Sequence, residues 1–208
     1  MMGAKIESDK KFIYLKAKKL NPIDFTFPKV SVTGTENLMM AATLAEGRTT
    51  LTNVAKEPEI IDLAEMLSSM GAKITGAGSD EIIIDGVNSL HGSEYSIPAD
   101  RIEAGTYLTA AAVTNGNITV EGINPKRLMK VINKLDDTGA DITYKKDSIS
   151  ISMNRDRPRP VDVTTAPFPE FPTDMQAQFS VINAISLSLI HISEPTRPLY
   201  ISYAVFCL

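Results

Sequence analysis

The stretch from Phe171 to Phe179 has the residue types best suited to chemistry, in the order Phe-Pro-Thr-Asp-Met-Gln-Ala-Gln-Phe. A proline, a hydroxyl residue and a carboxylate lead into small and apolar residues typical of a helix. In one interpretation Thr173 caps this helix and Asp174 lies in its first turn, where the helix dipole favours negative charge. In the other, the Asp174 carboxylate is a general base for a substrate hydroxyl. The pattern alone favours the plain helix start.

A second candidate site is the segment 29–34, Lys-Val-Ser-Val-Thr-Gly. Small residues and backbone N–H groups at a helix entrance suit an anionic ligand, and Lys29 adds positive charge. The segment is not a P-loop, because the Gly-Lys-Ser/Thr ending is absent. On its own it is a weak indication of anion binding.

Both segments belong to a chain that repeats itself. Residues 2–6, Met-Gly-Ala-Lys-Ile, return unchanged at 70–74 and, in the looser form Thr-Gly-Ala-Asp-Ile, at 138–142, a spacing of 68 residues each time. A period above the solenoid range predicts a small α/β unit copied in tandem, with each copy needing its neighbours to complete a core. Met2 is expected to fall at a helix end, so the first copy is expected to lack its beginning.

Hydrophobic spacing, prolines and glycines predict the order helix, strand, helix, strand, strand in each copy. Gly47 is expected to end the first helix, and Pro58 to open the second. The expected helices are Thr35 to Glu46, Pro58 to Gly71, Ile102 to Thr114 and Pro125 to Thr138. The expected strands are 49–54, 73–76, 81–85, 117–121, 141–144 and 148–152. The apolar faces expected to point inward are Ile60, Leu63, Ala64 and Leu67, and Leu128, Val131, Ile132 and Leu135. A third copy begins at Thr173.

Composition sets broad limits on the function. The chain has 208 residues, of which 43% are apolar, enough for one or two domains with a real core. A net charge of −4 and the lack of an aromatic–basic stripe disfavour nucleic-acid binding. The lysine-rich first twenty residues are interpreted as a solvated strand face. The sequence shows no signal peptide and no apolar run that could span a bilayer, so a cytoplasmic location is expected.

Together, several segments resemble the UDP-N-acetylglucosamine 1-carboxyvinyltransferase family. They are 171–179, which is the most specific, and 29–32, 41–47, 57–60 and 100–103. The resemblance runs from about Met2 to Ser186. In that family a βαβαββ unit is repeated six times and builds two lobes, an inside-out α/β barrel around a cleft.

The resemblance implies an α+β fold of such tandem repeats, in truncated form. Residues 1–97 would be a partial first lobe and 98–186 a partial second lobe. Residues 187–208 would be a tail outside the family. Part of that tail, 187–198, reads like translated sequencing-adapter DNA, so the tail is interpreted as an artefact. His191 and Cys207 within it are therefore not site candidates.

The family transfers the enolpyruvyl group of phosphoenolpyruvate to the 3′-hydroxyl of UDP-N-acetylglucosamine in peptidoglycan synthesis. By resemblance Asp174 is the base for that hydroxyl, Thr173 binds substrate beside it, and Arg101 positions the sugar nucleotide or supports closure. The residues implied to line the uridine and diphosphate are Lys29, Val30, Ser31 and Val32. The implied partners are these two small molecules, with no nucleic acid, membrane or obligate protein partner. No cofactor and no metal are implied.

Parts of the family's machinery lie outside the matched segment. The family has a lysine and a mobile loop with a cysteine or aspartate acid ahead of this segment, and further arginines in its last two units. We therefore expect this chain alone to be inactive. Two alternatives stay open: a shikimate-type enolpyruvyl transferase, which the 171–179 stretch argues against, and a non-catalytic nucleotide-sugar-binding module or pseudogene product.

Overall fold

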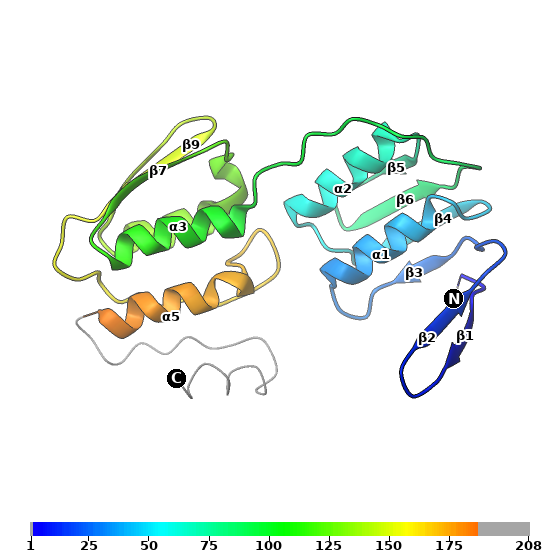
Figure 1. The fold of residues 1–208 in the computed structure, drawn as a ribbon, viewed down its shortest axis with the longest axis horizontal. Coiled ribbons are helices and arrows are strands. Elements are labelled where there is room, and N and C mark those ends of the chain that lie inside the picture. The colour runs from blue at the N-terminus through cyan, green and yellow to red at the C-terminus, as the bar shows by residue number, and fades with distance from the viewer. Residues whose placement is uncertain (1, 187–208) are drawn as a thin grey trace. The chain divides into compact units, whose positions relative to one another are not determined.

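The computed structural model describes residues 2–186, which form two compact units, one ending at Ile97 and the other beginning at Pro98. Figure 1 shows both units, each with helices packed on a sheet. Each unit has its own hydrophobic core. Within residues 2–186, no helix is both long enough and apolar enough to cross a membrane.

Unit 1 contains a complete βαβαββ element order after an initial hairpin. The hairpin strands are β1 (Lys5–Ser8) and β2 (Ile13–Lys16). The elements that follow are β3 (Asp24–Thr26), α1 (Val32–Ala42), β4 (Arg48–Thr52), α2 (Pro58–Ser69), β5 (Lys73–Thr75) and β6 (Glu81–Asp85). The four-stranded sheet has the order β3-β4-β6-β5, in which β3 pairs parallel to β4 and the other pairs are antiparallel.

Unit 2 repeats the later part of this order and then begins another copy. Its elements are α3 (Arg101–Val113), β7 (Asn117–Glu121), the 3₁₀ turn η1 (Pro125–Leu128), α4 (Met129–Asp137), β8 (Asp141–Tyr144), β9 (Ser148–Ser152), the 3₁₀ turn η2 (Thr173–Met175) and α5 (Gln176–Ile185). The sheet has the order β7-β9-β8 and is antiparallel throughout.

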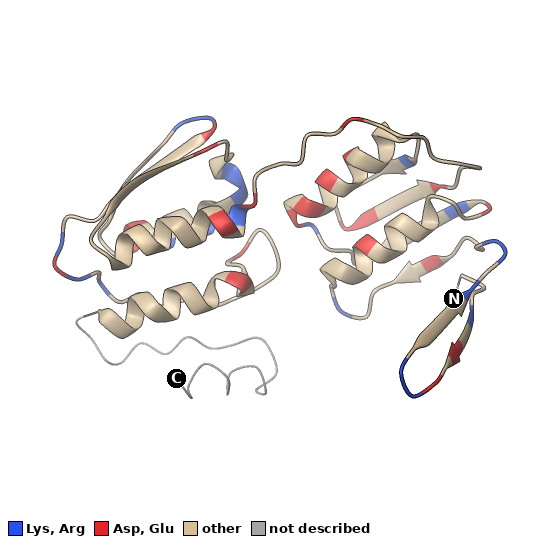
Figure 2. Ribbon diagram, viewed as in Figure 1, with Lys and Arg blue, Asp and Glu red and all other residues tan. Residues whose placement is uncertain are grey.

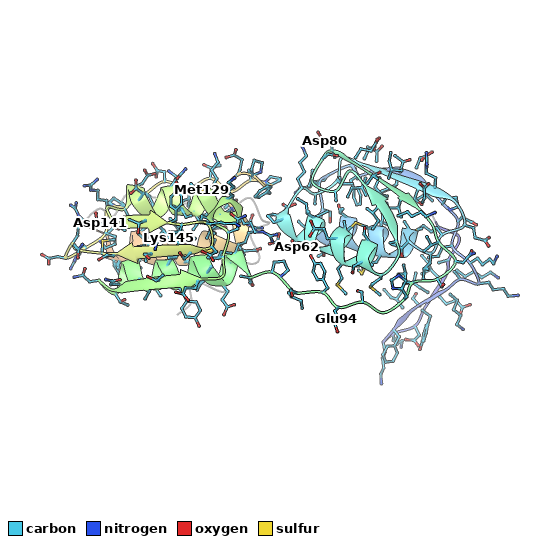
Figure 3. The ribbon with its side chains drawn as sticks, turned by 90° about the horizontal axis from the view of Figure 1, so that it is seen from above. Asp62, Asp80, Glu94, Met129, Asp141 and Lys145 are labelled. Carbon is cyan, nitrogen blue, oxygen red and sulfur yellow. The ribbon has the colours of Figure 1, made fainter. Side chains whose placement is uncertain are left out.

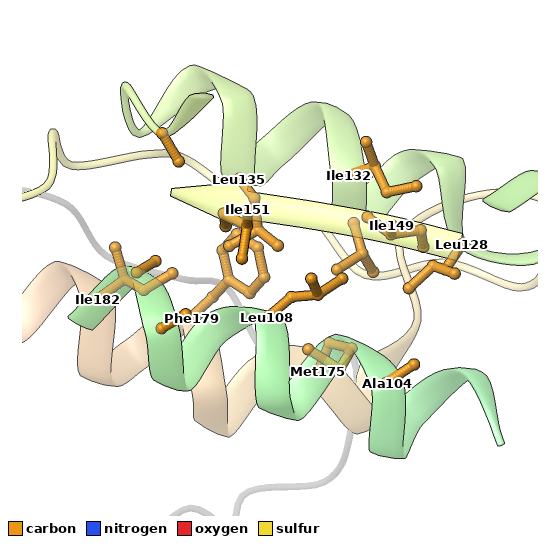
Figure 4. Packing of buried hydrophobic residues seen from close by; sticks show 14 of the residues in the cluster. Ala104, Leu108, Leu128, Ile132, Leu135, Ile149, Ile151, Met175, Phe179 and Ile182 are labelled. Atoms are coloured by element: carbon orange, nitrogen blue, oxygen red, sulfur yellow. The ribbon is translucent and has the colours of Figure 1, made fainter. Parts of the chain in front are cut away.

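Strand alternation gives each sheet one apolar face, and helices cover that face. In unit 1, Leu51, Ile82 and Ile84 are fully buried. In unit 2, Ile149 and Ile151 of β9 are buried beneath α3 and α4. Figure 4 shows Leu108 of α3, Leu135 of α4 and Phe179 of α5 close to the side chains of β9. Because successive strand residues point to opposite faces, the opposite face carries the polar residues, such as Thr119 and Ser150, whose hydroxyl oxygens lie 2.8 Å apart.

The predicted repeat order is confirmed in both copies. The predicted inward residues are also buried, except Leu63, which is only partly buried. The predictions for strands 141–144, 148–152, 117–121 and 81–85 match β8, β9, β7 and β6 in their bounds. All residues of β1 and β2 are exposed, which confirms the prediction of solvated strands for the lysine-rich start.

Several predicted boundaries are wrong, for local reasons. Helix α1 begins at Val32 instead of Thr35, because the Ser31 hydroxyl accepts a hydrogen bond from the Gly34 N–H and caps the helix. It ends at Ala42 instead of Glu46, so Gly47 lies in the turn before β4. Strand β4 ends at Thr52 because Asn53 adopts a left-handed φ of 54°, and its side chain bonds the Phe27 carbonyl.

Other differences concern elements whose sequences give only a weak signal of secondary structure. The predicted helix 125–138 opens as the 3₁₀ turn η1. The three-residue strand β3 was not predicted. Met2, expected at a helix end, is the first described residue, lies just before β1 and is buried against the unit 1 core, and the equivalent Met70 caps the end of α2. The side chains of Asp80 and Glu94 extend from the surface of unit 1 (Figure 3).

Equivalent isoleucines in two hairpins offer a matched test of burial. Ile82 of β6 is fully buried, whereas Ile13 of β2 is 72% exposed. We expect Ile82→Ala to lower the free energy of unfolding of unit 1 by about 2–5 kcal/mol, through lost burial and the cavity left behind. Ile13→Ala is expected to change it by less than about 0.5 kcal/mol. Urea titration followed by hydrogen exchange of unit 1 peptides measures both, and equal effects would contradict the assigned core.

Candidate substrate-binding sites

The first candidate site lies at the start of α3. The Asp100 side chain caps this helix, because its Oδ1 accepts hydrogen bonds from the N–H groups of Ile102 at 2.7 Å and Glu103 at 3.3 Å. The next residue, Arg101, is only 8% exposed. Its guanidinium carbon lies 6.0 Å from the centroid of the Phe168 ring, at the limit of a cation–π contact. The Arg101 side chain is therefore packed against an aromatic ring instead of extending into solvent.

The second part of this site is the turn η2, which leads into α5. Its N-cap position is Pro172, with no side-chain cap bond, and the Met175 N–H donates to the Pro172 carbonyl at 3.1 Å. The prediction that Thr173 caps this helix is therefore wrong, whereas Asp174 does lie in the first turn. Thr173 is half-buried and Asp174 is exposed. The carboxylate of Asp174 is thus accessible from solvent at a helix start.

Two contacts hold η2 and α5 against α3. Met175 is fully buried, and a Cβ on Gly105 would lie only 3.0 Å from its sulfur and terminal carbon. One turn further, Gln178 Nε2 donates to Thr106 Oγ1 at 2.9 Å. Figure 4 shows Ala104 and Met175 at the same end of the two neighbouring helices. The beginnings of α3 and α5, which carry Arg101 and Asp174, therefore lie at one end of unit 2.

The loop that carries Phe168 is attached to α5. The Asn183 side chain accepts from the Val161 N–H at 3.0 Å and donates to the Val161 carbonyl at 2.9 Å. Phe171 packs edge-on against Phe179, with 4.9 Å between ring centroids. Sequence reasoning missed Phe168, because one aromatic in a proline-rich loop gives no signal of what it contacts.

The second candidate site is the start of α1 in unit 1. Besides capping α1 through its hydroxyl, Ser31 accepts a bond from Thr35 Oγ1 at its carbonyl, and Thr35 Oγ1 accepts one from the Ala55 N–H. Val30 and Val32 are partly buried against the core, while Lys29 is exposed. This entrance therefore combines a fixed backbone with one exposed cation.

Acidic side chains lie at the same end of unit 1, and Figure 2 shows their positions along α1 and α2. Burial raises the pKa of Glu36, and the nearby carboxylates of Glu59 and Glu57 raise it further. Among residues 2–186, no three His, Cys, Asp or Glu side chains are grouped as a metal site requires.

Comparison with known proteins identifies the family to which the chain belongs. The family model described as EPSP synthase (3-phosphoshikimate 1-carboxyvinyltransferase) matches residues 1–192. The chain belongs to the EPSP synthase family of enolpyruvyl transferases. The match covers both units, so the two candidate sites fall inside one family domain.

Solved structures show the same fold. The enolpyruvyl transferase NikO from Streptomyces tendae matches with a TM-score of 0.77 at 19% identity, over 89% of this chain and 47% of that chain. EPSP synthase from Acinetobacter baumannii matches with a TM-score of 0.58 at 24% identity, over 88% of this chain and 42% of that one. The predicted enolpyruvyl transferase fold is thus confirmed, and the chain spans about half the length of these neighbours.

The two hydrogen bonds between the Asn183 side chain and the Val161 backbone, called the Asn183 clamp below, give a stability prediction. Asn183→Ala leaves the Val161 N–H and carbonyl without their side-chain partner, so we expect a loss of about 1–3 kcal/mol in the stability of unit 2. Hydrogen exchange of peptides from 158–171 should rise in step with this loss. Asn117→Ala, at an exposed position of β7, is the control. Equal effects of the two changes would show that the clamp does not hold the loop.

The raised pKa of Glu36 gives a pH prediction. A raised pKa means that ionisation of Glu36 opposes folding, and this cost is present at neutral pH and disappears as the pH falls and the group becomes protonated. Glu36→Gln is therefore expected to raise the melting temperature of unit 1 at pH 7 and to have little effect at pH 3. Thermal unfolding at several pH values tests this. Glu94→Gln, at an exposed position, should change little at any pH, and a Glu36→Gln gain that persists at pH 3 would contradict the explanation.

Proposed function

We propose that this chain is part of a UDP-N-acetylglucosamine 1-carboxyvinyltransferase, which moves the enolpyruvyl group of phosphoenolpyruvate to the sugar 3′-hydroxyl in peptidoglycan synthesis. The observation that supports it most is the exposed Asp174 carboxylate in the first turn of the segment 171–179. That segment is also the one most specific to this transferase by resemblance. The proposed reaction would take place in the cytoplasm.

In this proposal Asp174 is the general base. It accepts the proton of the 3′-hydroxyl as the sugar oxygen bonds to the central carbon of phosphoenolpyruvate and the terminal carbon takes up a proton, which opens the double bond. Loss of phosphate from the central carbon and of a proton from the terminal carbon then restores the double bond. Burial of Met175 against Gly105 fixes the turn that carries the carboxylate, so the base is held by the core. Thr173, the residue before it, is half-buried and is assigned to substrate binding in the same turn.

The remaining assigned residues bind the sugar nucleotide. In unit 1, the diphosphate and uridine are assigned to the entrance of α1, formed by Lys29, Val30, Ser31 and Val32. Backbone N–H groups of a helix start and one lysine are groups that bind phosphate. In unit 2, Arg101 at the start of α3 is assigned to positioning the substrate. Its packing on Phe168 restricts the guanidinium before any ligand binds.

A shikimate-type transferase is the second candidate. It is favoured by the family description itself, which is that of 3-phosphoshikimate 1-carboxyvinyltransferase. The two candidates differ in the acceptor, a nucleotide sugar in one and a small phosphorylated ring acid in the other. A third outcome is a module that binds a nucleotide sugar without turnover.

Ligand binding separates these candidates. We expect calorimetry of this chain to detect UDP-N-acetylglucosamine but not shikimate 3-phosphate. Lys29→Ala should weaken that binding roughly 10–100-fold, the worth of one charge-assisted hydrogen bond. Lys18→Ala, at an exposed position outside the assigned site, is the control. Preferential binding of shikimate 3-phosphate would replace the proposal with the second candidate, and binding of neither ligand would reject both.

Turnover tests the role of Asp174. In this chain joined to the remaining repeats of a carboxyvinyltransferase, Asp174→Asn is expected to lower kcat by roughly 10²–10⁴-fold, because the amide cannot accept the proton. Phosphate release from phosphoenolpyruvate measures this loss. Asp156→Asn, an exposed carboxylate elsewhere in unit 2, should leave kcat unchanged. Near-normal turnover in Asp174→Asn would remove the assigned base.

A further inference from the structure

The turn that follows α3 contains the one Asn-Gly pair of the sequence, Asn115-Gly116. Asn115 adopts a left-handed φ of 55°, the conformation common just after a helix cap. The Gly116 N–H donates to the Ala111 carbonyl at 2.8 Å. This bond closes the last turn of α3 and engages the backbone nitrogen of Gly116.

The Asn115 side chain joins this turn to the segment that follows β9. In the amide orientation that matches donors with acceptors, its nitrogen donates to the Arg155 carbonyl at 3.0 Å and to the Met153 carbonyl. The Met153 N–H in turn donates to the Gly116 carbonyl at 3.0 Å. Met153 is buried in the core of unit 2, so the fold of that unit holds both residues of the pair.

An Asn-Gly pair can be modified without an enzyme. The glycine nitrogen attacks the carbonyl carbon of the asparagine side chain and forms a C–N bond, and the side-chain nitrogen leaves as ammonia with the proton of the glycine N–H. Water then opens the resulting cyclic imide at either of its carbonyl carbons, which leaves aspartate or isoaspartate. Glycine favours the attack, because no Cβ hinders its nitrogen and its backbone is the most permissive.

Asn53 offers an internal comparison. It has nearly the same left-handed φ, 54°, and its side-chain nitrogen donates to the Phe27 carbonyl at 2.6 Å. The residue after it is Val54, whose branched side chain crowds the backbone nitrogen that would attack. The two asparagines therefore share a backbone conformation and differ in the residue that supplies the nucleophile.

We propose that Asn115-Gly116 is a site of spontaneous deamidation, and that the folded state of unit 2 keeps it closed. In the folded unit, the Ala111 carbonyl holds the attacking N–H, and the carbonyls of Met153 and Arg155 hold the amide that must leave. Opening of this turn releases both groups at once. The proposal does not depend on which substrate the chain binds.

The product cannot rebuild the closed turn. A carboxylate accepts hydrogen bonds but donates none, so an acid at position 115 would face the carbonyls of Met153 and Arg155 without a proton to share. Asn115→Asp is therefore expected to lower the urea midpoint of unit 2. Asn133→Asp, at an exposed position of α4, should leave that midpoint unchanged. Equal midpoints of the two variants would overturn the proposed hold on the amide.

Peptide mass spectrometry of the whole chain tests the proposal. The chain is incubated at pH 7 in buffer and in urea that unfolds unit 2, and the conversion of Asn115 from amide to acid is followed over time. We expect this conversion to be at least about tenfold slower in buffer, because it requires the turn to open. Asn53 should stay an amide in both solutions. A synthetic peptide of residues 111–120 in the same two solutions measures the direct effect of urea on the reaction.

Two variants separate opening of unit 2 from other causes. Asn183→Ala, which removes contacts within unit 2, should speed the conversion in buffer by at least about threefold, whereas Ile82→Ala, which lowers the stability of unit 1, should not. Equal rates in buffer and urea, once the peptide rates are divided out, overturn the proposal, and so does a lack of conversion of Asn115 in urea. Equal acceleration by both variants overturns the assignment of the protection to unit 2.

Discussion

One-sided burial of short sheets is the constraint on which the rest of this structure depends. Strand alternation places isoleucines on one face of each sheet, and a sheet of three or four strands cannot bury that face by itself. Two helices per copy do so, and the turns between helix and strand are set by this packing. The starts of α1 and α3 and the turn η2 before α5 are fixed as a result, and the candidate substrate-binding residues lie at these places.

The sequence was sufficient to predict the repeat because the signals were redundant. Pro58, Gly71 and the apolar spacing of α2 all indicated the same helix, and its predicted bounds nearly match the observed ones. The predicted boundaries are wrong where a single side chain decides where a helix begins or a strand ends. The Ser31 cap makes α1 begin three residues before its predicted start. Asn53 ends β4 through a hydrogen bond to a carbonyl that is distant in the sequence. The Asn53 bond joins residues 26 positions apart and cannot be read from spacing, whereas the Ser31 cap is a local bond to the N–H three residues along the chain.

The candidate sites could be predicted from the sequence less completely than the repeat. The 171–179 stretch pointed to Asp174 as a first-turn carboxylate, and the structure has it there. The supporting contacts, from Arg101 to Phe168 and from Gln178 to Thr106, join residues about 70 positions apart in sequence, so only the fold reveals them. The comparison shows membership of the EPSP synthase family, and the acceptor proposed above rests on individual residues in the two sites.

The close packing of Met175 on Gly105 has a consequence for how this family's sequences can diverge. At Gly105, helix α3 has no side chain, and the space there is filled by a flexible methionine from the turn η2 that leads into α5. A Cβ at 105 would require the end of the Met175 side chain to shift by a few tenths of an ångström, and a larger residue would require more space, which a smaller residue at 175 would provide. Positions 105 and 175 thus form a pair whose summed side-chain volume is expected to stay constant. Where the residues at both positions change together among relatives, the distance between α3 and α5 is expected to be kept.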